Sequence, residues 1–201
     1  MGGRAFLQIL PPSSLPRLPT SLYVTLNTRL TALLLTLFAI VKVPPEKPEK
    51  EDHGDIDFIV ACPLNRHGIT PGLVGQVLGA VQSIELDGNR TSNYAIKINQ
   101  EDWLVHSAQP LLSDHVYCQV DVRVCDDEQE AEWMTILHGY GDLGIIIGAI
   151  AKSHGLSLNH HGLKVFVASA HYSQEISTQS SDCKSSSRSS NASRKFPSTD
   201  S

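Results

Sequence analysis

The chain lacks the cysteine patterns that define zinc modules and disulfide scaffolds. Its 201 residues include four cysteines, and no two of them form a Cys-x-x-Cys pair. No set of cysteines and histidines has the spacing of a zinc finger. Cys62, Cys118 and Cys125 border apolar segments, a position typical of buried, reduced thiols in an intracellular protein. We therefore expect the protein in the nucleus or the cytoplasm.

Long apolar runs and an excess of basic residues are also absent. The most apolar run, residues 30–43, is interrupted by two threonines and a lysine and is shorter than the roughly 20 residues that span a bilayer. A charged, proline-rich stretch follows it, unlike a secretory cleavage site. We predict a core-packed helix over residues 22–41 and no membrane partner. The net charge of −5 and the lack of a long Lys/Arg run argue against tight nonspecific binding to duplex DNA.

The composition changes along the chain in a way that predicts one domain between two tails. Residues 1–20 contain four prolines, which remove backbone donors and predict a flexible, extended arm. Residues 173–201 are rich in serine and poor in apolar side chains, which predicts disorder. Residues 21–172 hold most of the apolar residues, enough for one hydrophobic core. A low-complexity tail could also reflect an incorrect gene model.

Two further helices are predicted from apolar periodicity and capping residues. The first covers residues 71–84, because Thr70 suits the N-cap, Pro71 suits the first helical position, and apolar residues follow at helical spacing. The second covers residues 141–154 and ends at Gly155. Its large apolar residues share one side: Leu143, Ile146, Ile147 and Ile150. Strands over 94–98 and 115–124 and a helix over 126–134 are predicted between them.

Paired carboxylates are the strongest chemical signal in the sequence. Asp55 and Asp57 stand in Gly-Asp-Ile-Asp-Phe-Ile-Val, where Gly54 precedes an apolar strand. Alternate residues of a strand point to the same face, so these two carboxylates project together. Two carboxylates on one face repel each other unless a cation lies between them, and such pairs suit Mg²⁺ bound together with substrate phosphates.

A third carboxylate, Asp121, lies in Gln-Val-Asp-Val-Arg-Val, where polar and apolar residues alternate. Three carboxylates on neighbouring strands could form a two-metal phosphoryl- or nucleotidyl-transfer site. Purely structural roles also fit the pattern, since Asp55 could cap a turn and Asp121 could face solvent. A metal shared by the adjacent His160 and His161 is not expected, because neighbouring strand residues point to opposite faces.

The order of these motifs resembles the palm of the nucleotidyltransferase superfamily. Leu137-His138-Gly139-Tyr140 is similar to the Tyr-Phe-Thr-Gly-Ser turn of family X DNA polymerases. The run over residues 155–163 is similar to their Gly-x-x-Leu-Asn-Glu-Tyr-Gly-Leu segment, without a gap between the two motifs. The resemblance covers roughly residues 53–165. It implies an α/β (α+β) palm-like fold, a mixed β-sheet with helices packed on one face, over residues 21–172.

The resemblance also implies residue roles. Asp55 and Asp57 match the two metal-binding aspartates, and Asp121 matches the third carboxylate, so all three are expected to be catalytic and to bind Mg²⁺ or Mn²⁺. Gly139 matches the turn glycine beside the incoming sugar, and Gly54 and Tyr140 complete the expected nucleotide-binding set. The expected partners are an NTP or dNTP and a hydroxyl acceptor, which includes nucleic acid.

Several family features are missing from this sequence. Residues 41–54 contain no Gly-Ser pair to hold the triphosphate, although Lys47 or Lys50 could contribute charge instead. The helix after the turn carries Gly144 and Ile146 where the family tends to have Asn and Arg. Two hypotheses therefore remain. One is an active, metal-dependent nucleotidyltransferase, and the other is a catalytically inactive palm-like module that binds nucleotide or nucleic acid.

Overall fold

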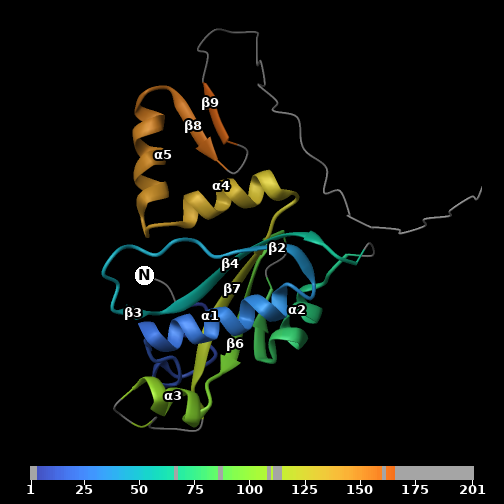
Figure 1. The fold of residues 1–201 in the computed structure, drawn as a ribbon. Helices are drawn as coiled ribbons and strands as arrows, with labels where there is room; N and C mark the ends of the chain where they lie inside the picture. Colours follow the sequence, from blue (N-terminus) through green and yellow to red (C-terminus); the bar gives the residue numbers. More distant parts are fainter. Residues whose placement is uncertain are drawn as a thin grey trace, which may run out of the picture.

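The computed structural model describes residues 4–65, 68–85, 88–107, 110, 115–159 and 162–165. The strands of its main sheet are β2 (Phe38–Lys42), β4 (Asp55–Pro63), β5 (Ala80–Ile84), β6 (Thr91–Lys97) and β7 (Tyr117–Val124). They pair in the order β2-β4-β7-β6-β5, and Figure 1 shows this sheet at the centre of the molecule. The central pair β4 and β7 is parallel, and the other pairs are antiparallel.

Helices and two short ladders surround the main sheet. The helices are α1 (Thr20–Leu34), α2 (Pro71–Leu78), α3 (Gln100–His106), α4 (Glu128–His138) and α5 (Leu143–Ser153). A short 3-10 helix covers Pro12–Ser14. The ladders pair β1 (Leu18–Pro19) with β3 (Asp52–His53), and β8 (Leu156–Asn159) with β9 (Gly162–Val165). The described chain is thus a mixed α/β structure, as expected from the sequence.

The helices pack on both faces of the sheet, not on one face as expected. In β4, Ile56, Phe58 and Val60 point into a large core cluster that includes the buried leucines of α1 and residues of α2 and α3. Ile59 and Ala61 point to the opposite face and pack on α4. This alternation follows directly from the strand period of two residues. Because Asp55 and Asp57 share the parity of Ile59, they lie on the α4 face.

Two predicted helices end earlier than expected and are followed by strands. The helix expected over residues 22–41 ends at Leu34, and residues 38–42 form β2, which pairs with β4. The helix expected over residues 71–84 ends at Leu78, because Gly79 has a φ of 68° and reverses the chain into β5. In both places, a purely local apolar pattern could not distinguish helix from strand pairing. The Thr70 cap is confirmed by its bond from the Leu73 N–H.

The other predicted elements agree with the structure to within a few residues. Strands expected over 94–98 and 115–124 correspond to β6 and β7, and the helix expected over 126–134 corresponds to α4. The helix expected over 141–154 is α5, and Gly155 follows it with a φ of 71°. Its apolar side is not a core face, however, because all four residues on it are exposed: Leu143, Ile146, Ile147 and Ile150.

The N-terminal segment differs from the extended arm that its prolines suggest. Phe6 and Leu18 are fully buried, and Leu18 and Pro19 pair with β3. Residues 4–20 are therefore packed on the domain. The tail expected over 173–201 and the His160–His161 pair lie outside the described residues.

Cysteine chemistry and membrane crossing are partly settled by the fold. Cys118 and Cys125 are buried free thiols, as expected. The expectation of a reduced thiol at Cys62 is wrong, because Cys62 is disulfide-bonded. Among the described residues, no single helix has the length and apolar character needed to cross a membrane. The pair α4 and α5 meets these criteria together, but it is bent by 98°.

Gly144 lies in close contact with the backbone at the end of α4, which excludes a larger residue at this position. A Cβ at Gly144 would lie 2.1 Å from the Leu137 carbonyl oxygen, which is backbone and cannot rotate away. We expect Gly144→Ala to destabilise the fold by about 1 to 3 kcal/mol, as overpacking usually does. Gly148→Ala in the same helix is the matched control, because a Cβ there meets nothing within 4 Å. Urea unfolding of both variants tests this, and equal midpoints would contradict the steric argument.

Candidate metal centre

The three predicted carboxylates converge at the middle of the main sheet. The parallel pairing of β4 and β7 sets Asp57 directly beside Asp121, and Asp55 beside Gln119. Asp55, Asp57 and Asp121 each offer a carboxylate oxygen, and these oxygens all lie within 4.8 Å of one another. All three side chains are half-buried. We call these three residues the carboxylate cluster.

The electrostatics of the carboxylate cluster reflect crowded negative charge. Burial, together with the neighbouring charges of Asp55 and Asp121, raises the pKa of Asp57 to about 7. Burial also raises the pKa of Asp121 to about 6, although hydrogen bonds from Asn93 and Gln119 act against this rise. Such values mean that the cluster prefers either a proton or another cation near neutral pH.

The donor set fits a hard divalent cation. Carboxylate oxygens are the ligands that Mg²⁺ and Mn²⁺ prefer, and the mutual repulsion of the cluster is what a bound cation would relieve. Asp55, Asp57 and Asp121 are the residues that would hold the ion. No sulfur or imidazole ligand belongs to the cluster, so its chemistry does not favour zinc.

Two amide side chains beside Asp121 were not found from the sequence. Asn93 Nδ2 donates to Asp121 Oδ1 over 2.7 Å, from the neighbouring strand β6. Gln119 Nε2 donates to both oxygens of Asp121, over 2.9 and 3.0 Å. Gln119 could have been found, because it stands two residues before Asp121 in an alternating strand. Asn93 could not, since the register of β6 against β7 is a tertiary feature.

The proline-rich loop of residues 44–51 contributes charged groups that act on the cluster. Glu46 accepts hydrogen bonds from Lys50 Nζ over 2.6 Å and from His53 Nδ1 over 3.2 Å. Burial would raise the pKa of Glu46, but these two bonds outweigh it, and the pKa lies below its ordinary value. The charges of Glu46 and Lys50 both reach Asp57, where Glu46 raises the pKa and Lys50 lowers it. The loop therefore lies within electrostatic range of the cluster.

His53 fixes this loop to the body of the domain. It is 2% exposed, and its ring stacks on the Tyr23 ring of α1 with centroids 3.8 Å apart. Burial lowers the pKa of His53, even though Glu46 acts in the opposite direction. Because His53 ends β3 and is followed by Gly54 and then Asp55, this packing also fixes where β4 begins.

The predicted nucleotide-binding residues lie in two turns. Gly54 joins β3 to β4, immediately before Asp55. Gly139 and Tyr140 follow α4, and the Tyr140 N–H donates to the Pro45 carbonyl oxygen over 2.6 Å. A Cβ at Gly139 would lie 2.9 Å from the Pro45 ring, so a glycine is needed for this contact. Gly139 and Tyr140 thus contact the same loop that carries Glu46 and Lys50.

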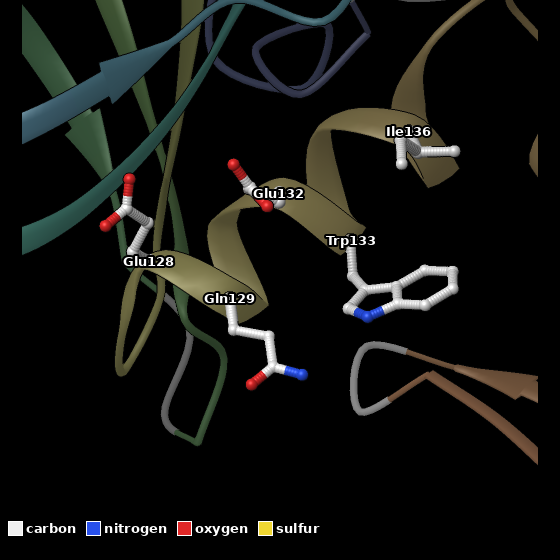
Figure 2. Close-up of a pocket in the computed structure, with 5 residues that line it drawn as sticks. All are labelled: Glu128, Gln129, Glu132, Trp133 and Ile136. Carbon is white, nitrogen blue, oxygen red and sulfur yellow. The ribbon is translucent and has the colours of Figure 1, made fainter. Parts of the chain in front are cut away.

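A hollow on α4 is separate from the carboxylate cluster. Figure 2 shows its lining residues, all from α4: Glu128, Gln129, Glu132, Trp133 and Ile136. Glu132 forms an ion pair with Lys42 over 3.3 Å, and the Trp133 ring lies against Gly162 of β9. These contacts give Trp133 a packing role beside the β8–β9 hairpin.

Comparison with known proteins adds no family assignment. The chain matches no protein-family model and no curated protein sequence. The case for its function accordingly depends on the geometry of the carboxylate cluster and its surroundings.

Proposed function

We propose that this protein is a metal-dependent nucleotidyltransferase-type domain, which transfers a nucleotidyl group from an NTP or dNTP to a hydroxyl. The observation that supports this best is the convergence of Asp55, Asp57 and Asp121 from two parallel strands. In the resembled family X DNA polymerases, three aspartates in this order bind the catalytic metals. A fold alone does not establish an activity, so the proposal depends on the residues of the site.

The proposed reaction needs an acidic centre next to a phosphate-binding surface. The acceptor oxygen would attack the α-phosphorus, the bond to the β-phosphate oxygen would break, and pyrophosphate would leave with the released proton passing to solvent. Mg²⁺ or Mn²⁺ bound at the cluster would supply charge neutralisation for the phosphates and lower the pKa of the attacking hydroxyl. Asp55 and Asp57 would hold this charge from one strand, and Asp121 would face the acceptor side.

Lys50 is the best candidate to replace the missing phosphate-binding Gly-Ser pair. Its Nζ forms an ion pair with Glu46 Oε2 over 2.6 Å, and its positive charge lowers the pKa of Asp57. Its side chain is 21% exposed to solvent, so the ammonium group can reach a ligand. A lysine acts on phosphate as a point charge and does not need the amide cradle of a glycine-rich turn.

Calorimetry of the full chain with a nonhydrolysable NTP, with and without Mg²⁺, tests this proposal. We expect Mg²⁺-dependent binding that disappears in the Asp55→Asn/Asp57→Asn double variant. Lys50→Gln should weaken nucleotide binding by about 10- to 150-fold, since one charge-assisted hydrogen bond contributes about 1.5 to 3 kcal/mol. The same variant should not weaken binding of Mn²⁺ alone, because it removes a positive charge near the cluster.

Lys47→Gln is the matched control for Lys50→Gln, because it makes the same change three residues earlier in the loop. Equal nucleotide affinity in Lys50→Gln and wild type would remove Lys50 from the site. The alternative is a palm-like module without activity, and the proline-rich loop in place of Gly-Ser is the observation that favours it. Nucleotide binding without any transfer to hydroxyl acceptors would support this alternative. A folded wild type that binds no nucleotide would contradict the proposed transferase and would leave nucleic acid as the ligand of the inactive module.

A further inference from the structure

Asp121 is held by a chain of amides that begins far away in the sequence. Asn93 and Gln119 both donate to Asp121, as described above, and Gln119 is only 3% exposed. The other end of the Gln119 amide is also occupied, because Gln119 Oε1 accepts a hydrogen bond from the Ala5 backbone N–H over 2.9 Å. Ala5 is separated from Gln119 by 114 positions.

The two ends of the Gln119 side chain leave it only one orientation. The ionised Asp121 carboxylate can only accept, and the Ala5 N–H can only donate. A reversed amide would set its oxygen against the carboxylate and its NH₂ group against the N–H. The Ala5 N–H therefore directs the Gln119 amide toward Asp121.

The segment that supplies this N–H is anchored to the domain. Phe6 is fully buried, and the N–H groups of Ile9 and Leu10 both donate to the Phe6 carbonyl oxygen, over 2.9 and 2.7 Å. This local turn fixes the backbone next to Ala5. The Ala5 N–H that donates to Gln119 thus belongs to a backbone segment that the buried Phe6 and the local turn hold in place.

The amide donors also distinguish the two oxygens of Asp121. Within the described part of the chain, Oδ1 accepts from Asn93 and from Gln119, whereas Oδ2 accepts only the longer bond from Gln119. Each carboxylate oxygen has about two lone-pair sites. Oδ1 is therefore filled by protein donors, and Oδ2 retains capacity for another partner.

We propose that Ala5, Gln119 and Asn93 are positioning residues of the carboxylate cluster, and that the segment of residues 5–10 is part of this site. This proposal rests on the metal binding of the proposed function. Ala5 fixes Gln119, and Gln119 and Asn93 fix Asp121 with Oδ2 directed to the cation. Groups that orient a metal ligand in this way typically change metal affinity by about 10- to 100-fold when removed.

The test measures Mn²⁺ affinity of the full-length protein by calorimetry. Gln119→Met keeps the approximate size of the side chain and removes the three hydrogen bonds of its amide group, so we expect at least about tenfold weaker Mn²⁺ binding. Ala5→Pro removes the N–H donor and also restricts the local backbone, and it should weaken binding in the same direction. Ile9→Ala is the control, because it changes an exposed side chain of the same segment and should leave the affinity unchanged.

Hydrogen exchange supplies a second measurement that needs no metal. The Ala5 amide should be protected in wild type and in Asp57→Asn, and it should lose protection in Gln119→Met. If wild type binds no Mn²⁺, the metal site of the proposed function fails. If wild type binds Mn²⁺ and both Gln119→Met and Ala5→Pro bind it equally well, the positioning role is overturned. An unprotected Ala5 amide in wild type would overturn it independently.

Discussion

Asp57→Asn is expected to stabilise the metal-free protein and to abolish its stabilisation by Mg²⁺. Asp57 carries the most strongly raised pKa of the cluster, to about 7, because of burial and of its neighbours Asp55 and Asp121. Asparagine has nearly the same shape without the charge. The variant therefore removes the repulsion between Asp57 and the other two carboxylates, whose oxygens lie within 4.8 Å of it. In the absence of metal its melting temperature should exceed that of wild type.

The effect of metal should reverse this order. Saturating Mg²⁺ at 100 times its dissociation constant stabilises a folded protein by about 2.7 kcal/mol, or about 5 to 10 °C in melting temperature for a domain of this size. Wild type should show this increase at pH 8, and Asp57→Asn should show almost none. The measurement is thermal unfolding of both proteins at pH 8, with Mg²⁺ and with a chelator.

A control variant separates the cluster from general charge effects. Asp142→Asn removes an exposed carboxylate at the start of α5, where its side chain makes no capping bond. It should retain the full response to Mg²⁺. If Asp57→Asn also retained the response, the ion would be bound elsewhere and the proposed centre would be refuted.

The sequence identifies the three carboxylates of the cluster, but it does not specify the strand pairing that brings them together. Strand alternation places Asp55 and Asp57 on one face, and it places Gln119 and Asp121 on one face. That the two pairs meet requires β4 and β7 to be neighbours in a parallel sheet, which the local pattern does not specify. The sequence suggested only that the carboxylates lie on neighbouring strands, and the parallel register is a finding of the structure.

Long-range contacts explain what the sequence could not show. The Ala5 N–H donates to Gln119 from a segment that we expected to be an extended arm. That expectation used only the prolines of the segment, and it did not consider that Phe6 could be buried against the domain. The exposure of the apolar side of α5 is likewise decided by tertiary packing. Its apolar residues share one side as expected, but its main contacts in the described chain are with α4 and β8, and the buried residue of α5 is Ala151. Periodicity identifies an apolar face, whereas tertiary packing decides whether that face is covered.

The pH dependence of stability should have opposite signs with and without metal. Asp57 and Asp121 have folded-state pKa values of about 7 and about 6, above their ordinary value of 3.8. The folded state therefore holds protons that the unfolded state has released. The stability that these two groups contribute is fully present below about pH 4, and it is lost as the pH rises to about 7.

A bound cation must displace these protons, so its affinity should increase over the same range. Below the pKa of Asp57, apparent Mg²⁺ affinity should fall by about tenfold per pH unit for each proton displaced. The stabilisation by Mg²⁺ should then be small at pH 5.5 and reach its full size at pH 8. Thermal unfolding across this range, with Mg²⁺ and with a chelator, gives both signs in one experiment.

Asp57→Asn tests whether Asp57 is the group responsible. The variant cannot release the proton assigned to Asp57, so its metal-free stability should decline less between pH 5.5 and pH 8 than that of wild type. The smaller decline that remains belongs to Asp121, whose pKa burial also raises. An Mg²⁺ effect of equal size at pH 5.5 and pH 8 in wild type would mean that the carboxylates are already ionised at the lower pH. In that case the cluster would be open to solvent, and its crowding would not be what attracts the ion.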